Sequence, residues 1–254
     1  HVKFLVENHK LPLSFYGSAD KMLNAINGYD ARIMYVDDQM SRLADYLKEQ
    51  NLFEDTLWVV TSDHGEGLGN HNYKGHGEFL YQEQLHVPLI FFHEGSIIPR
   101  KIDSLVRTVD IFPTITDFFG KELKKLSPDI VGHSLKPLLL GLPWDERLIQ
   151  YSFAERRPKD MISFRRNWEE GEIYSLHNLE HKYIEHSLGA DEYYNLKEDP
   201  FEEVNIDAEP SSNRDQIKST LDSIFNPSKR NQEVLIEQEH SPEEIEELKS
   251  LGYL

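Results

Sequence analysis

The spacing of apolar side chains predicts one long helix near the start of the chain. Apolar residues recur every three or four positions over about seven helical turns, which is the pattern of one helix face. These residues are Met22, Ile26, Tyr29, Ile33, Val36, Met40, Leu43 and Leu47. Ser18 or Asp20 can cap the start of this helix and Asn51 can end it. We expect the helix to pack on a sheet, although a coiled coil shows the same spacing.

The segments around this helix predict an α/β fold. Residues 1–17 mix apolar residues with turn formers, and they predict a short strand and a loop. Residues 57–62 and 87–92 are apolar runs of the kind found in strands buried on both faces. Residues 108–120 predict a helix that begins near Asp110 and ends before Gly120. This order predicts a largely parallel sheet flanked by helices.

The pattern changes near residue 147. Short aromatic-rich runs separated by turns predict a small antiparallel sheet, and they cover residues 148–154, 161–166, 172–177, 182–186 and 193–196. Two acidic helices follow, and the last begins at Ser241-Pro-Glu-Glu244, a capping sequence. We therefore expect two parts, residues 1–147 and residues 148–254.

Composition narrows the possible functions. The chain has 254 residues and no cysteine, which excludes a disulfide framework, a thiol nucleophile and thiolate metal sites. Its formal charge is −18, and residues 191–254 contain 17 acidic and 6 basic side chains. A field of this sign repels nucleic acid and anionic membranes, and no apolar run reaches the roughly 20 residues that a membrane span needs. An anionic substrate would therefore need a local metal or a cluster of Lys and His.

The loop after the first predicted strand supplies such groups. Asp63 and His64 precede Gly65, and a turn at this glycine lets a carboxylate and an imidazole converge on one cation. Calcium, manganese and zinc accept such ligands. An Asp-His pair also occurs as a simple hydrogen-bonding couple, so the residues by themselves leave both interpretations open.

Further cationic or cationisable side chains follow within a dozen residues. His71, Lys74 and His76 lie among glycines that let the backbone bring them together. They suit an anionic ester, and the alternative is a polar surface loop.

Several ordered motifs make the sequence resemble the C-terminal half of the sulfatase family, in the alkaline phosphatase superfamily. The resemblance covers roughly residues 20–254. The motifs are Thr61-Ser-Asp-His-Gly-Glu66, Gly75-His-Gly77, Val87-Pro-Leu-Ile90, Val109-Asp-Ile-Phe-Pro-Thr114, Gly132-His-Ser-Leu-Lys-Pro-Leu138, Glu192-Tyr-Tyr-Asn-Leu196 and Leu248-Lys-Ser-Leu-Gly-Tyr253.

The resemblance implies a role for each residue of the loop. Asp63 and His64 match metal ligands that usually hold calcium in sulfatases, with manganese or zinc expected in a phosphoesterase. His76 matches a catalytic position that contacts the ester oxygens or the leaving group, and Lys74 lies close enough to share in substrate binding. Glu66 and His71 are implied to orient the ligands and the loop, with ordinary loop hydrogen bonding as the alternative.

The chain departs from the family at the nucleophile. Sulfatases use a formylglycine made from Cys or Ser in a Cys/Ser-x-Pro-x-Arg motif, which is absent here. Ser96-Ile-Ile-Pro-Arg100 has the wrong spacing. The chain also begins without an initiator Met or a signal-like run, which is typical of a fragment or a processed product. We therefore expect the formylglycine in the N-terminal half of the same protein, which would be the partner of an otherwise inactive chain.

The function implied for the intact protein is hydrolysis of a small anionic sulfate ester, in a periplasmic or extracellular location. The near alternative is a phosphodiesterase or phosphonate monoester hydrolase of the same superfamily. A different class of alternative is a non-catalytic binding protein that keeps the fold.

Overall fold

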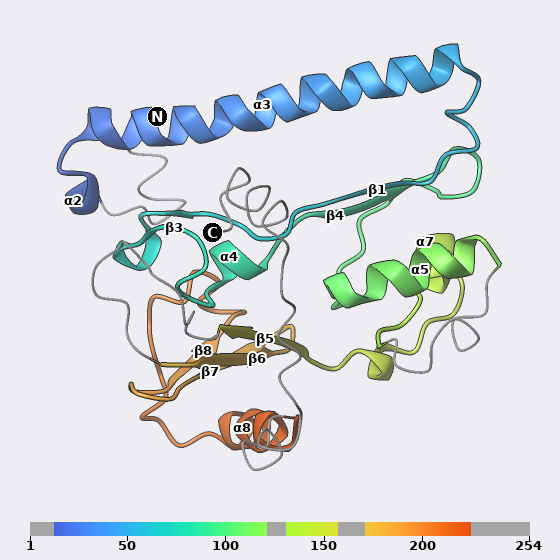
Figure 1. The fold of residues 1–254 in the computed structure, drawn as a ribbon. Coiled ribbons are helices and arrows are strands. Elements are labelled where there is room, and N and C mark those ends of the chain that lie inside the picture. The colour runs from blue at the N-terminus through green and yellow to red at the C-terminus, as the bar shows by residue number, and fades with distance from the viewer. Residues whose placement is uncertain (1–12, 121–130, 157–170, 225–254) are drawn as a thin grey trace, which may run out of the picture. The chain divides into compact units, whose positions relative to one another are not determined.

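The computed structural model describes residues 13–120, 131–156 and 171–224 (Figure 1). The chain divides into two compact units, residues 1–218 and residues 219–254. The predicted run 161–166 and the predicted helix from Ser241 lie outside the described residues, and the expected boundary at residue 147 stays a prediction. None of the helices in the described part combines the length and the apolar character needed to cross a membrane.

The long helix is confirmed as α3, Ala19–Glu49. Ser18 caps it, because its side chain accepts a hydrogen bond from the Lys21 amide at 3.3 Å, and Asn51 follows its end with a left-handed φ of 55°. Only the first part of the apolar face is covered: Met22 and Ile26 are buried, whereas Ile33 is 53% exposed.

The segment before α3 differs from the expected strand and loop. Leu13–Tyr16 form one helical turn, α2, and the remaining residues up to 12 lie outside the described part. The Tyr16 hydroxyl donates to the Leu68 carbonyl, and Tyr16 packs against Met22 and Ile26. The contact with Leu68 spans 52 residues of sequence, so local patterning did not reveal the turn.

The two predicted strands exist as β1, Trp58–Thr61, and β4, Leu89–Phe92, but they pair antiparallel. The expectation of a largely parallel sheet is therefore wrong for the described residues, where every strand pairing is antiparallel. Parallel neighbours need a crossover, usually a helix. The connection here holds instead the short hairpin β2, Gly67–Leu68, with β3, Lys74–Gly75, a single 3₁₀ turn at Asn70–Asn72, and one helical turn α4, Gln82–Leu85.

These strands are also less buried than expected. In β4, alternate side chains face solvent, with Ile90 55% and Phe92 36% exposed. The sequence predicted burial on both faces of this strand, but only the face with Leu89 and Phe91 packs against the apolar cluster in the described residues.

The helix predicted over residues 108–120 is confirmed as a 3₁₀ turn, Thr108–Asp110, followed by α5, Ile111–Phe118. It is followed by α7, Lys136–Leu140, and a 3₁₀ turn, Glu146–Leu148. Leu135 and Leu139 pack with Phe91 of β4 and Phe118 of α5 in one apolar cluster.

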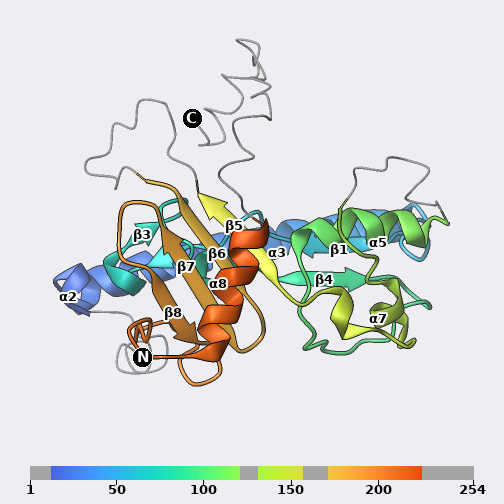
Figure 2. The same ribbon diagram turned by 90° about the horizontal axis from the view of Figure 1, so that it is seen from below.

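The small antiparallel sheet is confirmed, and its strands lie in sequence order (Figure 2). They are β5, Ser152–Arg156; β6, Ile173–His177; β7, His181–His186; and β8, Glu192–Asn195. One face buries Ile173, Ile184 and Tyr194 against Leu80 of the β1–β4 connection. That connection is therefore fixed to the sheet. The first predicted acidic helix is α8, Ser212–Ile224.

Candidate functional site

Asp63 and His64 lie two and three residues after the end of β1, in the first turn of the β1–β4 connection. The His64 amide donates to Asp63 Oδ1 at 3.0 Å, and the Ser62 hydroxyl donates to the His64 carbonyl at 2.6 Å. These bonds hold a tight turn in which Asp63 is exposed and His64 is half-buried. The two side chains therefore lie side by side at the end of a strand, where the sequence placed them.

The imidazole of His64 has a defined orientation. Its Nδ1 lies 2.8 Å from the Gly65 carbonyl, and because a carbonyl only accepts, Nδ1 carries the proton and donates. In the neutral ring Nε2 carries the lone pair, and this atom lies 3.7 Å from Asp63 Oδ2. That distance is too long for a hydrogen bond. A lone pair beside a carboxylate oxygen is an arrangement that a bound cation stabilises.

His76 reaches the same place from the far end of β3. Its ring stacks on that of His64, with centroids 3.8 Å apart and planes inclined by 25°. His76 Nδ1 donates to Glu66 Oε2 at 3.1 Å, and the Tyr73 hydroxyl donates to the His76 carbonyl at 2.8 Å. The structure thus brings together Asp63, His64, Glu66 and His76.

Lys74 lies in β3, opposite Leu68 of β2, and it is exposed. Its position in the hairpin places it two residues before His76, on the same short segment of the loop. Lys74 therefore lies close in sequence to His76, and its side chain is exposed to solvent.

His71 points elsewhere. Its Nδ1 lies 2.8 Å from Glu83 Oε1 and its Nε2 lies 2.9 Å from the Glu202 carbonyl, and its ring stacks on Tyr81 at 3.6 Å. Both partners are acceptors, so both ring nitrogens donate and the imidazole carries a positive charge. Burial lowers the pKa of His71, but the hydrogen bond and charge of Glu83 outweigh it, and the pKa is raised.

Glu202, whose carbonyl contacts His71, also forms a buried ion pair that sequence reasoning missed. Lys182 Nζ lies 2.6 Å from Glu202 Oε1, and neither side chain is exposed. Burial lowers the pKa of Lys182 and raises that of Glu202, more than their mutual attraction restores. The sequence carried no clear signal, because β7 reads His-Lys-Tyr-Ile-Glu-His, and only the fold reveals the partner of the lysine 20 residues later.

Gly65 and Gln84 join the two turns of the loop. The Gly65 amide donates to the Gln84 carbonyl at 2.8 Å, and the Gly77 amide donates to Gln84 Oε1 at 3.0 Å. A Cβ at Gly65 would lie 2.0 Å from the Glu83 carbonyl oxygen, so only glycine fits there. Gln84 itself is buried.

The sequence motifs around Asp110 and His133 are hydrogen-bonded to each other. Buried Asp110 accepts from the amides of Arg107 and His133, at 2.9 Å each, and from the Arg107 guanidinium. The Thr114 hydroxyl accepts from the Leu135 amide at 2.8 Å. These polar side chains hold α5 against the segment before α7, which gives them a structural role.

The loop can be tested for a metal site by its geometry. In the described ranges, no group of three or more His, Asp or Glu side chains converges closely enough to hold a metal. Asp63 and His64 fit a divalent cation by donor chemistry, because a carboxylate and a neutral imidazole are common ligands. Further ligands would have to come from elsewhere.

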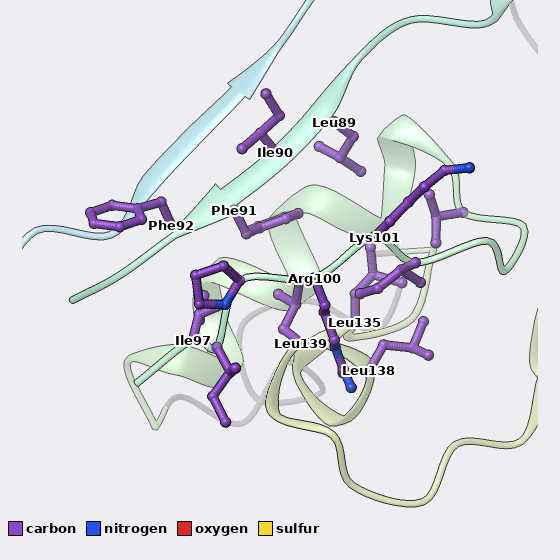
Figure 3. Close-up of a pocket in the computed structure, with 14 residues that line it drawn as sticks. Leu89, Ile90, Phe91, Phe92, Ile97, Arg100, Lys101, Leu135, Leu138 and Leu139 are labelled. Carbon is purple, nitrogen blue, oxygen red and sulfur yellow. The ribbon is translucent and has the colours of Figure 1, made fainter. Parts of the chain in front are cut away.

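An apolar cavity of about 510 Å³ lies apart from this loop, beside β4 and α7 (Figure 3). Leu89, Phe91, Ile97, Leu135 and Leu139 line it, with the charged groups of Arg100 and Lys101 at its wall. None of the predicted site residues contributes to its lining.

Comparison with known proteins relates the part of the chain that contains this loop to a protein family. Residues 5–121, a little under half of the chain, match the family described as Sulfatase. This part of the chain is therefore similar to sulfatases.

Individual proteins similar to this chain are also sulfatases by name. The chain is 27% identical over 237 residues to arylsulfatase K of Mus musculus, covering 88% of this chain and 42% of that protein. It is 33% identical over 184 residues to an N-acetylglucosamine-6-O-sulfatase of Bacteroides thetaiotaomicron, covering 70% of this chain and 31% of that protein. The chain thus spans less than half the length of these relatives.

Solved structures support the fold. A structure described as a complex with its substrate, D-glucosamine-2-N,6-O-disulfate, has a TM-score of 0.67 and 27% sequence identity, covering 84% of this chain and 43% of that chain. The alkaline phosphatase-like fold expected from the motifs is supported at this level.

The assignment to the C-terminal half of the family is wrong. The family match lies at the start of the chain, residues 5–121. Short motifs indicate a loop after a strand, but they do not indicate how far that loop lies from either end of a protein.

Proposed function

We propose that the loop over residues 63–77 forms part of the active site of a metal-dependent sulfatase. One observation carries the proposal. His64 Nε2 lies beside Asp63 Oδ2, and His76 stacks on the same ring. A candidate cation ligand pair and a group able to meet an anionic ester thus lie side by side, on two turns of one loop.

Asp63 and His64 would hold the cation, with calcium the first candidate and manganese or zinc the alternatives for a phosphoesterase. A carboxylate suits all three metals, and the imidazole favours the softer two. When bound, the cation stabilises negative charge on the ester oxygens.

His76 would contact the ester oxygens or the leaving group. Its Nδ1–H is held by Glu66, so Nε2 is the atom that faces substrate and holds or accepts a proton. Exposed Lys74 would add a positive charge near the entrance. Glu66 fixes the ring of His76, whereas His71 acts at a distance, through Glu83 and Glu202.

The attacking group would come from polypeptide outside these 254 residues. The sequence contains no cysteine and no Ser-x-Pro-x-Arg motif from which a formylglycine could be made. We therefore propose that this chain alone does not turn over sulfate esters.

Sulfated amino sugars are the substrate class to test first. The relative at 33% identity is named for N-acetylglucosamine 6-O-sulfate, and the solved structure at 27% identity is described with a disulfated glucosamine. The net charge of −18 requires in addition that the site itself be locally cationic.

Calcium titration of the chain by calorimetry tests the metal ligands. Asp63→Asn removes the charged ligand yet keeps an acceptor for the His64 amide, and it should weaken calcium binding at least about tenfold. Asp37→Asn, on an exposed part of α3, is the matched control and should not change it. Equal affinity in all three proteins would refute the proposal.

Turnover needs the complete protein that contains this sequence. Glucosamine 6-sulfate, an aryl sulfate and an aryl phosphonate, supplied in parallel, separate a sulfatase from a phosphonate monoester hydrolase. Calcium binding without turnover of any ester would favour a non-catalytic binding protein.

A further inference from the structure

A chain of hydrogen bonds connects the four-stranded sheet to both turns of the proposed site. It starts at the ion pair of Lys182, in β7, with Glu202, in the turn after β8. Glu202 has a left-handed φ of 56°, which a residue with a side chain rarely adopts. Such a conformation persists only where the surrounding structure holds it.

Glu202 holds both ends of the segment from residue 71 to residue 82. Its carboxylate Oε2 accepts from the Gln82 amide at 2.6 Å, while its own carbonyl accepts from His71 Nε2 at 2.9 Å. Lys182 occupies the other carboxylate oxygen. One buried residue thus fixes the segment that contains Lys74 and His76.

The next link runs from this segment to the proposed ligands. Two residues after Gln82, the carbonyl of Gln84 accepts from the amide of Gly65, the neighbour of His64. The Gln84 side chain accepts from the amide of Gly77, the neighbour of His76. The two rings that stack at 3.8 Å are therefore each followed by an amide bonded to the same buried glutamine.

We propose that Glu202, supported by Lys182, and Gln84 are positioning residues that hold His64 and His76 in register for the cation and the ester. The side chains of these three residues are bonded to groups other than the side chains of Asp63 and His64. They act through the Gly65 and Gly77 amides. This inference rests on the proposed function, because it assigns the network to that site.

Lys182 keeps the acceptor in place. A carboxylate without a partner in this buried position would take up a proton and lose strength as an acceptor. The neighbouring lysine favours the ionised form and offsets part of the effect of burial, which supports Oε2 as the acceptor of the Gln82 amide.

A pair of double variants separates positioning from general stability. Lys182→Met/Glu202→Leu removes both charges and the acceptor for Gln82, whereas Lys182→Met/Glu202→Gln removes the charges and keeps an acceptor oxygen. Replacing both charges together avoids leaving one of them buried and unpaired. The two variants thus differ in the hydrogen bond that the proposal depends on.

Two readouts on the full chain test the prediction. The Leu variant should weaken calcium binding at least about tenfold and should speed hydrogen exchange at the Gly65 and Gly77 amides by a similar factor. The Gln variant should stay within about threefold of the wild type in both. Gln84→Leu and Gln84→Glu repeat the comparison at the Gly77 amide if the Leu double variant does not fold.

Unchanged calcium affinity and unchanged exchange at both glycines in the Leu variant, or in Gln84→Leu if that double variant does not fold, would overturn the positioning role. The proposed function fails separately, if wild-type calcium binding does not depend on Asp63. In that case, the exchange rates still decide whether the network holds the two turns.

Discussion

The imidazole rings of His64 and His76 stack at a centroid distance of 3.8 Å, although the two residues lie twelve positions apart in the sequence. This contact gives His76 two separable functions. Its ring supports the orientation of His64, and its Nε2 is the atom proposed to meet the ester.

The first prediction separates those functions with two substitutions at His76. His76→Phe keeps a ring for stacking, so calcium affinity should stay near that of the wild type, while turnover by the complete protein should fall about 10²- to 10⁴-fold. His76→Ala should lose the same activity and also weaken calcium binding. If His76→Phe releases calcium as Asp63→Asn does, His76 is a metal ligand and the roles are exchanged.

The second prediction concerns the buried ion pair. Lys182→Met alone leaves Glu202 buried without its partner, and it should lower the free energy of unfolding by about 3–5 kcal/mol. Lys182→Met/Glu202→Leu should recover most of that loss. Urea denaturation measures both.

An exposed pair of the same length is the control for this prediction. Lys197 and Glu180 also lie 2.6 Å apart, with side chains 71% and 52% exposed, so Lys197→Met should change stability little. Equal effects at Lys197 and Lys182 would show that burial does not govern the cost.

The third prediction is a loss of stability in acid that depends on His177. Burial lowers the pKa of His177 from 6.5 to about 4, and the charge of Lys182 acts in the same direction. The unfolded chain binds a proton first, so the folded state loses stability as the pH falls from 6.5 towards 4. At ~1.4 kcal/mol per pKa unit the loss approaches roughly 3 kcal/mol.

The free energy of unfolding, measured by denaturation at a series of pH values, tests the acid sensitivity attributed to His177. His177→Phe should flatten the dependence in that range. A slope that is unchanged in the variant would assign the acid sensitivity to other groups.

The fourth prediction has the opposite sign and concerns His71. The pKa of His71 is raised because Glu83 and the Glu202 carbonyl favour its charged form, despite burial beside the Tyr81 ring. Its stabilising effect is complete below the ordinary pKa of histidine and is lost as the pH rises through the raised value. Melting temperatures measured from pH 6 to 9 should therefore fall more steeply in the wild type than in His71→Gln.

The fifth prediction concerns two glycines in different surroundings. A Cβ at Gly65 would meet the Glu83 carbonyl at 2.0 Å, so Gly65→Ala should displace the loop and cost about 1–3 kcal/mol. Gly28 lies in α3, where an added methyl group would have nothing within 4 Å, and Gly28→Ala should stabilise by about 0.5–1 kcal/mol. Thermal melts of both variants test the contrast, and a stable Gly65→Ala with native calcium binding would contradict it.

Sequence reasoning predicted the elements whose signals are local. The period of α3, its cap at Ser18, the capped helix near Asp110 and the alternating runs of the small sheet all depend on residues within a few positions of one another. The same holds for the turn of Asp63 and His64. Their positions could therefore be inferred from patterns alone.

Sequence reasoning failed where long-range contacts decide. The strands β1 and β4 carry the same apolar pattern whether they run parallel or antiparallel, because the pattern records burial and not direction. The turn α2 forms against Leu68, more than 50 residues away. His71 was grouped with the site by sequence proximity, yet its bonds lie with Glu83 and Glu202.

The sequence by itself determined which side chains are candidates to bind a cation or to meet an anionic ester, and in which loop they lie. The tertiary structure alone decided which of them meet. The pairing of Lys182 with Glu202 and the stacking of His64 on His76 join residues that no local period relates. The segment after β8 returns to β7 and places Glu202 beside Lys182, and the hydrogen bonds of Gln84 brace the turns that carry the second pair.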